Sequence, residues 1–131
     1  MKISNLFNSE KTVFSFEVFP PKKTSPIESV YGKLEEISAL KPDFISVTYG
    51  AGGSRSKKTV EMTSYIQNNL HIPALAHLTC YSSTRETVKS VIDQLKNNNI
   101  ENILALRGDI PKDVDFPLPD QYRHASELIE D

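Results

Sequence analysis

The chain has 131 residues, of which 38% are hydrophobic and 24% are charged, and its formal net charge at pH 7 is −2. This composition is typical of a globular domain with a real core and excludes a disordered chain. The small charge gives no electrostatic basis for binding nucleic acid or an acidic membrane surface, and no apolar run is long enough for a membrane span. Residues 1–11 lack the apolar stretch of a secretory signal, and a single cysteine excludes an internal disulfide framework. We therefore expect a cytoplasmic protein.

The first predicted strand covers residues 13–19, which are mostly β-branched or aromatic and run into two prolines. Proline cannot donate a hydrogen bond to a ladder, so the strand is expected to end there. A helix is expected next. Ser25 can cap it, Pro26 suits the first helical position, and Glu28 completes a capping box.

The alternation of strand and helix repeats along the chain. Further strands are predicted at 43–49, 73–79 and 102–107, and further helices at 57–69, 83–95 and 122–131, with a loop at 50–55. A second capping box, Ser83 to Glu86, is expected to open the third helix. Lys57 and Lys58 are interpreted as a solvated start of the second helix.

Strands that alternate with amphipathic helices indicate parallel strands joined by right-handed crossovers. Two architectures fit, an open doubly wound sheet and a (β/α)8 barrel. The barrel is favoured because each strand becomes polar on one face toward its C-terminal end, where barrels carry their active sites. A complete barrel needs roughly 250 residues. The predicted fold class is therefore α/β, the N-terminal half of a (β/α)8 TIM barrel. About four βα units occupy residues 1–131, which end after the start of the fourth helix.

Side-chain alternation also predicts which residues share a face. In the third strand Leu75 and His77 lie on one face, and in the fourth Ile103, Ala105 and Arg107 lie on one face. We assign both sets to the interior of the barrel.

Glu17 is the most informative single residue, since it lies between Phe16 and Phe19 just before the prolines. Apolar flanks favour the neutral form of a carboxyl group, which suits a general acid near neutral pH. The alternative is a structural ion pair with Arg107 across the barrel, and the residues alone leave the two interpretations open.

The other candidates are less specific. The glycine-rich loop at 50–53 could let the backbone approach a flat ligand, although an ordinary flexible loop is the simpler explanation. His77 and Cys80 are more simply explained as core residues than as catalysts.

The segment from Arg107 to Asp109 closes the fourth strand. The arginine could hold a phosphate or carboxylate, and the aspartate could accept hydrogen bonds from a heterocycle. The alternative is an internal pair between the two residues around a turn at Gly108.

Four segments together resemble the methylenetetrahydrofolate reductase family. They are FSFEVFPPK at 14–22, SVTYGAGG at 46–53, AHLTC at 76–80 and LALRGD at 104–109. Each is weakly specific alone, whereas all four in this order and spacing are strongly specific.

The resemblance implies a (β/α)8 barrel that binds FAD at the C-terminal ends of its strands. It implies the reduction of 5,10-methylenetetrahydrofolate to 5-methyltetrahydrofolate in one-carbon and methionine metabolism. NAD(P)H gives hydride to the flavin and leaves, and the folate then takes hydride from the reduced flavin.

The resemblance also implies the roles of individual residues. Glu17 would be the general acid and a folate contact, and Asp109 would bind folate beside the flavin. Thr48 would lie near the nicotinamide. The implied cofactor-binding residues are Thr48, Tyr49, Ala51, His77, Arg107, Gly108, Asp109 and Ala125. His124 stands where the family often has tyrosine.

The chain departs from the family in length, because the later strands with further flavin and folate contacts are absent. The chain alone is expected to be incomplete as an enzyme and to form a homo-oligomer, with no metal site. The alternatives are a non-catalytic half barrel that serves as a binding or assembly module, and a different barrel enzyme acting on pterins or phosphorylated sugars.

Overall fold

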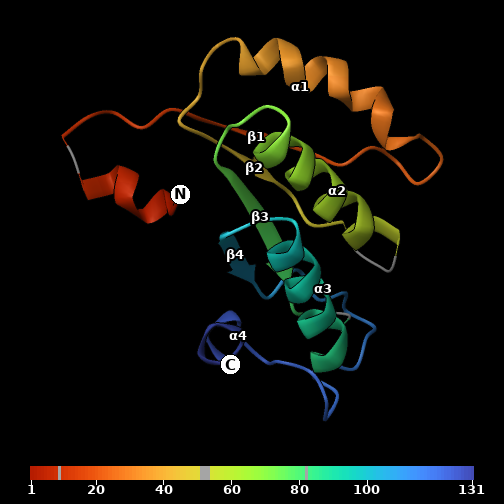
Figure 1. The fold of residues 1–131 in the computed structure, drawn as a ribbon. Coiled ribbons are helices and arrows are strands. Elements are labelled where there is room, and N and C mark those ends of the chain that lie inside the picture. The colour runs from red at the N-terminus through yellow and green to blue at the C-terminus, as the bar shows by residue number, and fades with distance from the viewer. Residues whose placement is uncertain (9, 51–53, 82) are drawn as a thin grey trace.

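The structure, a computed structural model, describes residues 1–8, 10–50, 54–81 and 83–131. In chain order, with η for a 3-10 helix, its elements are η1 (Ile3–Asn8), β1 (Ser15–Val18), η2 (Ile27–Val30), α1 (Tyr31–Ser38), β2 (Phe44–Val47), α2 (Ser54–Asn68), β3 (Ala74–Thr79), α3 (Arg85–Asn97), β4 (Asn102–Leu106) and α4 (Ala125–Glu130). The four strands form one parallel sheet in the order β1-β2-β3-β4 (Figure 1). The predicted α/β class and parallel pairing are confirmed.

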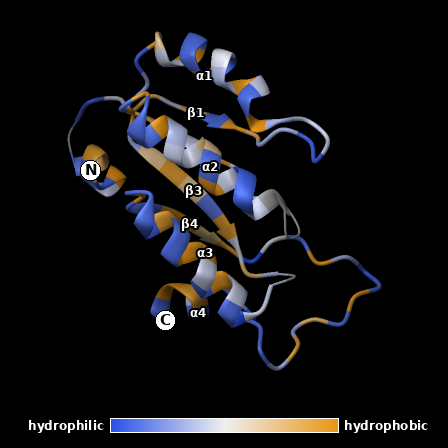
Figure 2. Ribbon diagram, turned by 45° about the vertical axis from the view of Figure 1, so that its right-hand side comes forward, coloured by the Kyte–Doolittle hydropathy of each residue, from blue (hydrophilic) through white to orange (hydrophobic). Residues whose placement is uncertain are grey.

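Helices α1, α2 and α3 follow one another along one face of the sheet, which we call the helix face (Figure 1). The strands turn small or branched apolar side chains toward these helices, and Val47, Ala76 and Leu78 are fully buried. The helices contribute buried side chains such as Leu34 and Leu95 to the same core. Figure 2 shows hydrophobic and hydrophilic residues alternating along the helices. Each buried aliphatic side chain stabilises this packing by about 1.5–3 kcal/mol relative to exposure.

The register of the strands defines the second face, which we call the open face. Glu17 pairs with Ser46, and His77 pairs with Leu104. Directly paired residues share a face. Glu17 and His77 therefore both lie on the face opposite the helices, together with Leu75, as predicted for the barrel interior.

The fourth strand contradicts the predicted assignment of faces. Ile103 pairs with Ala76, and Ala105 pairs with Leu78, both of which belong to the helix face. Ile103 and Ala105 therefore point toward the helices, and Leu104 takes a position on the open face. Ile103 and Ala105 do share one face, as the alternation predicts, but Leu104 on the other face is apolar too. Ile103 and Leu104 are also similarly exposed, at 37% and 41%, so hydrophobicity alone does not distinguish the two faces of β4.

The starts of the helices also differ from prediction. The first helix has Pro26 as N-cap without a side-chain bond, and the chain passes through η2 before α1 begins. The first turn is closed by the carbonyl oxygen of Pro26, which accepts from the N–H of Ser29 (3.2 Å), so the N-cap position falls on Pro26 and not on Ser25. In α3 the N-cap is Thr84 and not Ser83, and its hydroxyl accepts a hydrogen bond from the backbone N–H of Thr87 (3.1 Å).

The second and fourth helices have shifted boundaries. α2 begins at Ser54, before the predicted start at 57, and the rest of the predicted loop at 51–53 lies outside the described residues. α4 begins at Ala125 and not at 122. Tyr122 is instead buried before the helix, where its hydroxyl donates to Oδ2 of Asp131 (2.5 Å). The loop between β4 and α4 extends away from the sheet (Figure 2).

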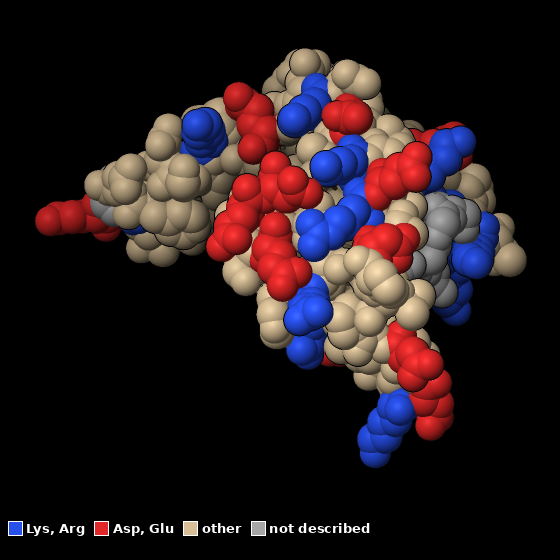
Figure 3. Space-filling model, turned by 90° about the horizontal axis from the view of Figure 1, so that it is seen from below, with Lys and Arg blue, Asp and Glu red and all other residues tan. Residues whose placement is uncertain are grey.

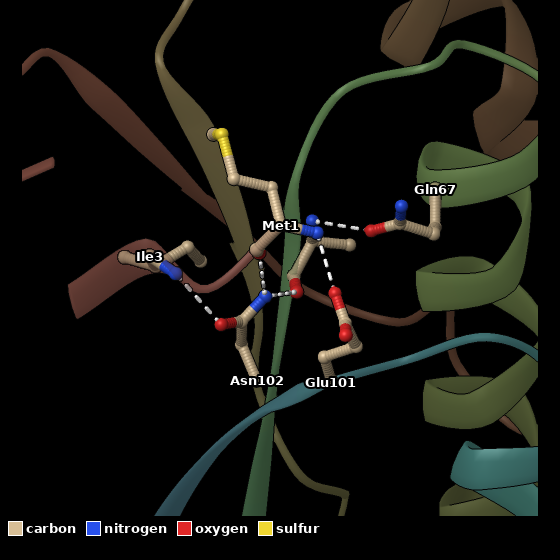
Figure 4. Close-up of polar contacts among 6 residues, drawn as sticks. Met1, Ile3, Gln67, Glu101 and Asn102 are labelled. Atoms are coloured by element: carbon tan, nitrogen blue, oxygen red, sulfur yellow. Dashed lines mark hydrogen bonds and ion pairs between the residues drawn. The ribbon is translucent and has the colours of Figure 1, made fainter. Parts of the chain in front are cut away.

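The N-terminal segment was not predicted as an element. The backbone N–H of Ile3 in η1 donates to Oδ1 of Asn102 (2.8 Å), and Nδ2 of Asn102 donates to the carbonyl oxygens of Met1 (3.0 Å) and Ala74 (3.3 Å) (Figure 4). Phe7 also packs edge-to-face on Phe44, with ring centroids 6.4 Å apart. The segment is therefore tied to the N-terminal ends of the strands.

The surface carries charges of both signs. Figure 3 shows acidic and basic side chains interspersed over the face seen from below. Of the helices within the described residues, none has both the length and the apolar character that crossing a membrane requires.

Candidate functional site

The predicted polar residues gather at the C-terminal edge of the sheet. Glu17 lies in the last half of β1 and His77 in the last half of β3, while Thr48 follows β2 directly and Arg107 follows β4 directly. Because the strands are parallel, their C-terminal ends share one edge. Asp109 lies two residues beyond Arg107. The fold thus brings residues up to 92 positions apart to one edge of the sheet.

Glu17 and His77 are in contact. Oε2 of Glu17 lies 3.5 Å from Nε2 of His77. The two side chains come from β1 and β3 and meet on the open face across β2. The residue of β2 on that face beside Glu17 is Ser46, and its small side chain leaves space above the strand. The partner of Glu17 is therefore His77 and not Arg107, which was the predicted alternative.

The two side chains of this pair have different environments. His77 is 11% exposed, whereas Glu17 is 52% exposed because its apolar neighbours Phe16 and Val18 point to the helix face. The apolar surroundings expected for Glu17 are therefore not found. Burial lowers the pKa of His77, and the charge of Glu17 opposes this effect. The imidazole is thus neutral at pH 7 and can either donate to a carboxylate or accept from a carboxylic acid.

A surface hollow lies beyond the ends of β1 and β2, and its lining begins two residues after Glu17. Its volume is about 720 Å³, and we call it the β1–β2 hollow. It is lined by Phe19, Pro20, Pro21, Lys22, Lys23, Thr24, Thr48, Tyr49 and Gly50. Burial raises the pKa of the Tyr49 hydroxyl, and hydrogen bonding with Ser56 and Ser83 opposes the rise. Two of the predicted cofactor contacts, Thr48 and Tyr49, thus lie on one wall of this hollow.

A second hollow of about 480 Å³ lies at the end of β4. It is lined by Leu106, Arg107, Gly108, Asp109 and His124, and we call it the β4 hollow. The backbone N–H of Tyr81 donates to the carbonyl oxygen of Arg107 (2.8 Å) and pins this turn to the end of β3. The ion pairs of the described residues do not include the predicted alternative, a pair between Arg107 and Asp109.

Gly108 is required in this turn. Its φ is +87°, and an added Cβ would lie 3.4 Å from the Cβ atoms of Thr79 and Tyr81. A side chain would be both strained and crowded there. The glycine therefore lets this turn pack closely against the end of β3.

The remaining predicted residues lie apart from the pair. Cys80 is fully buried in the core, which also raises the pKa of its thiol, so its interpretation as a small buried hydrophobe is confirmed. Ala125 is the first residue of α4, next to His124 of the β4 hollow. Ala51 lies outside the described residues.

Sequence reasoning missed the parts of the site that depend on distant contacts. Ser46 starts one of the family-like segments, at 46–53, but its place beside Glu17 requires the strand register. Lys58 was interpreted as solvated, but its ammonium binds the loop after β1. The proline pair in that loop was a visible signal, because two of its residues have no N–H to donate to backbone hydrogen bonds.

Comparison with known proteins yields one consistent family. The family model described as methylenetetrahydrofolate reductase matches residues 2–131. Methylenetetrahydrofolate reductase (NADH) 1 of Arabidopsis thaliana is 36% identical over 110 residues, which are 84% of this chain and 19% of the relative. Methylenetetrahydrofolate reductase 1 of Schizosaccharomyces pombe is 34% identical over 122 residues, 92% of this chain and 20% of the relative. The 5,10-methylenetetrahydrofolate reductase of Escherichia coli K12 is 36% identical over 115 residues, 88% of this chain and 38% of the relative. The chain thus spans about a fifth of the plant and yeast relatives and less than two fifths of the bacterial one.

Proposed function

Because the chain belongs to the methylenetetrahydrofolate reductase family, we propose that it supplies the first four βα units of a (β/α)8 catalytic barrel. The complete protein reduces 5,10-methylenetetrahydrofolate to 5-methyltetrahydrofolate, with FAD as cofactor and NAD(P)H as electron donor. The observation that carries this proposal is the contact between Glu17 and His77 near the C-terminal edge of the sheet.

The arrangement of the sheet supports the barrel. Its strands follow one another in sequence order, and α1, α2 and α3 pack on the same face. An open doubly wound sheet would place helices on both faces. A barrel instead leaves one face inward and closes the free edges of β1 and β4 against later strands. The polar residues on the open face, Glu17 and His77, then face the interior near its active rim.

The β4 hollow has the chemistry that FAD needs. Arg107 offers a guanidinium group to a phosphate or to a ring oxygen, and Asp109 offers a carboxylate to a ring N–H. Gly108 lies between these two residues in the lining of the hollow. We assign Tyr49 and His77 to the same cofactor from the neighbouring strands. When bound, FAD supplies the hydride carrier between nicotinamide and folate.

Glu17 provides the proton in this proposal. Its half-exposed carboxyl group can reach a ligand on the open face, and it gives a proton to the folate nitrogen that leaves as the five-membered ring opens. The neutral imidazole of His77 holds the carboxyl group in place. Asp109 contacts the folate from the β4 side.

The test separates the two half-reactions of the complete enzyme. Stopped-flow absorbance at the flavin band follows reduction by NAD(P)H, and then reoxidation by methylenetetrahydrofolate. Glu17→Gln keeps the shape of the side chain but cannot give up a proton, so folate reduction should fall by roughly 10²-fold or more while flavin reduction is spared. Glu28→Gln, an exposed carboxylate on η2, is the matched control and should change neither rate. Equal losses in both half-reactions would contradict the role of Glu17.

A further inference from the structure

Lys58 makes an unusual set of contacts. Its ammonium group donates hydrogen bonds to the backbone carbonyl oxygens of Lys22 (2.6 Å), Lys23 (3.2 Å) and Ser25 (2.7 Å). An ammonium group has three N–H donors, and here all three are used by carbonyl oxygens of one loop. The adjacent Lys57 is exposed and lies 3.9 Å from Glu61 of its own helix.

The loop that Lys58 binds connects β1 to η2. Its second and third residues are prolines, which have no N–H to donate. In its second half the N–H of Ser25 donates to the carbonyl oxygen of Lys22 (3.0 Å). Residues 19–24 of this loop form one wall of the β1–β2 hollow, and residues 48–50 form the other. Lys58 belongs to α2, so its ammonium ties the first wall to that helix.

The hollow carries positive charge on the wall that Lys58 holds. The side chains of Lys22 and Lys23 are exposed, and within the described parts of the chain neither has an ion-pair partner. Phe19 on the same wall is 69% exposed. An exposed ring next to two free ammonium groups suits a ligand that joins a flat group to an anion.

We propose that Lys58 is a positioning residue that locks the loop after β1, so that Lys22 and Lys23 form an anion-binding rim beside Glu17. The rim would receive a phosphate or carboxylate group of the ligand whose reacting end lies at Glu17. The identity of that ligand rests on the proposed function, but the locking of the loop does not.

The lock is tested by limited proteolysis with trypsin, which cleaves after Lys22 and Lys23. Lys58→Met has a similar length but no donors, so the loop should open and the rate of the first cuts at these bonds should rise roughly tenfold or more. Lys58→Arg keeps a cation with several donors and should stay near the wild-type rate. Lys57→Met is the matched control and should also leave the rate unchanged. Mass spectrometry identifies the cuts, and far-UV circular dichroism checks the fold.

The anion rim is tested by steady-state kinetics of the complete enzyme. Loss of a contact used equally in the ground and transition states raises KM and leaves kcat unchanged. Lys58→Met should therefore raise KM roughly tenfold for one substrate, with kcat within about twofold, and Lys58→Arg should restore it. If only the KM for NAD(P)H rises, the rim binds the phosphates of NAD(P)H. If only the KM for the folate rises, the rim binds the carboxylates of the folate.

The outcomes separate this proposal from the proposed function. Unchanged cleavage in Lys58→Met would overturn the lock, whether or not the protein is a reductase. Faster cleavage with both KM values unchanged would overturn the anion rim. Faster cleavage in a protein without reductase activity would support the lock and contradict the proposed function. If Lys58→Met does not fold, Lys58→Gln, which keeps two donors, should show an intermediate increase in cleavage.

Discussion

Asn102 is expected to determine much of the stability of the N-terminal segment. Its amide accepts from the backbone of Ile3 and donates to the carbonyl oxygens of Met1 and Ala74, and its side chain is largely buried (Figure 4). In Asn102→Ala all three hydrogen bonds, which together clamp η1 to the sheet, are lost. The backbone N–H of Ile3, a buried residue, then loses its acceptor at residue 102. An unsatisfied buried donor costs about 1–3 kcal/mol, and each further bond contributes about 0.5–1.5 kcal/mol. We expect a loss of about 2–4 kcal/mol in the free energy of unfolding.

The assay is equilibrium urea unfolding at one fixed protein concentration. With a slope of about 2 kcal/mol/M, the midpoint should fall by roughly 1–2 M. The amide of Ile3 should also exchange with solvent faster in Asn102→Ala. Asn97→Ala, an exposed position at the end of α3, is the matched control and should change stability by no more than about 0.5 kcal/mol.

A second substitution sharpens the same reasoning. Asn102→Asp keeps the acceptor for Ile3 but turns a carboxylate oxygen toward two carbonyl oxygens. Folding should therefore raise the pKa of the new carboxyl group, because its protonated form can donate to one of them. A raised folded pKa gives stability that is present at low pH and lost as pH rises through that pKa. Relative to the wild type, Asn102→Asp should thus recover stability on acidification. Equal stability of Asn102→Ala and the wild type, with unchanged exchange at Ile3, would refute the reasoning.

Three further predictions concern the open face and its rim. Asp109→Asn should raise the reduction potential of bound flavin, because a negative charge is removed where reduction adds one; an unchanged potential in a loaded variant would contradict the placement of Asp109. Burial lowers the pKa of His77 in the folded state below its unfolded pKa of about 6.5. The stability that His77 contributes is therefore fully present above roughly pH 6.5 and is lost as the pH falls toward the folded-state pKa. His77→Gln should flatten the stability curve in that window, and parallel curves would argue against a buried neutral imidazole. The free edges of β1 and β4 and the exposed Leu104 should make the 131-residue chain associate, and Leu104→Lys should reduce the association. Size-exclusion chromatography with light scattering tests this, and a stable monomer would contradict it.

The alternation of strands and helices could be predicted because each strand is short, β-branched and bounded by turn residues. The faces of β1, β2 and β3 could also be predicted, since one side of each strand becomes polar near its end. β4 could not be assigned in the same way, because Leu104 and Ala105 are both apolar. The pairings of Ile103 with Ala76 and of Ala105 with Leu78 show which side faces the helices.

The site was predictable as a set of residues but not as a geometry. Glu17 and His77 were both singled out, but their contact joins side chains 60 positions apart and depends on the register of three strands. The N-terminal segment was missed for a related reason, because the partner of Ile3 lies 99 positions away. Local patterns carry no information on such contacts. The capping predictions failed more locally, since each of the two helices begins one residue later than its capping box predicts, with Pro26 and Thr84 at the N-cap positions.

Polar residues lie at both ends of the strands, and we expect those at the N-terminal end to stabilise the fold and those at the C-terminal end to act on a ligand. Asn102 stands at the first residue of β4 and is enclosed by backbone groups that it satisfies, so it contributes to the fold. Glu17 stands near the end of β1 with its carboxyl group half exposed, so it remains available to a ligand. In a barrel, residues at the N-terminal face serve stability and those at the C-terminal face serve function. A substitution at Asn102 should therefore lower the unfolding midpoint while the ratio of the two half-reaction rates stays constant. A substitution at Glu17 should change that ratio with little change in the midpoint. If Asn102→Ala also changed the ratio, the two ends of the sheet would be coupled, and the clamp on η1 would have to be counted as part of the active site.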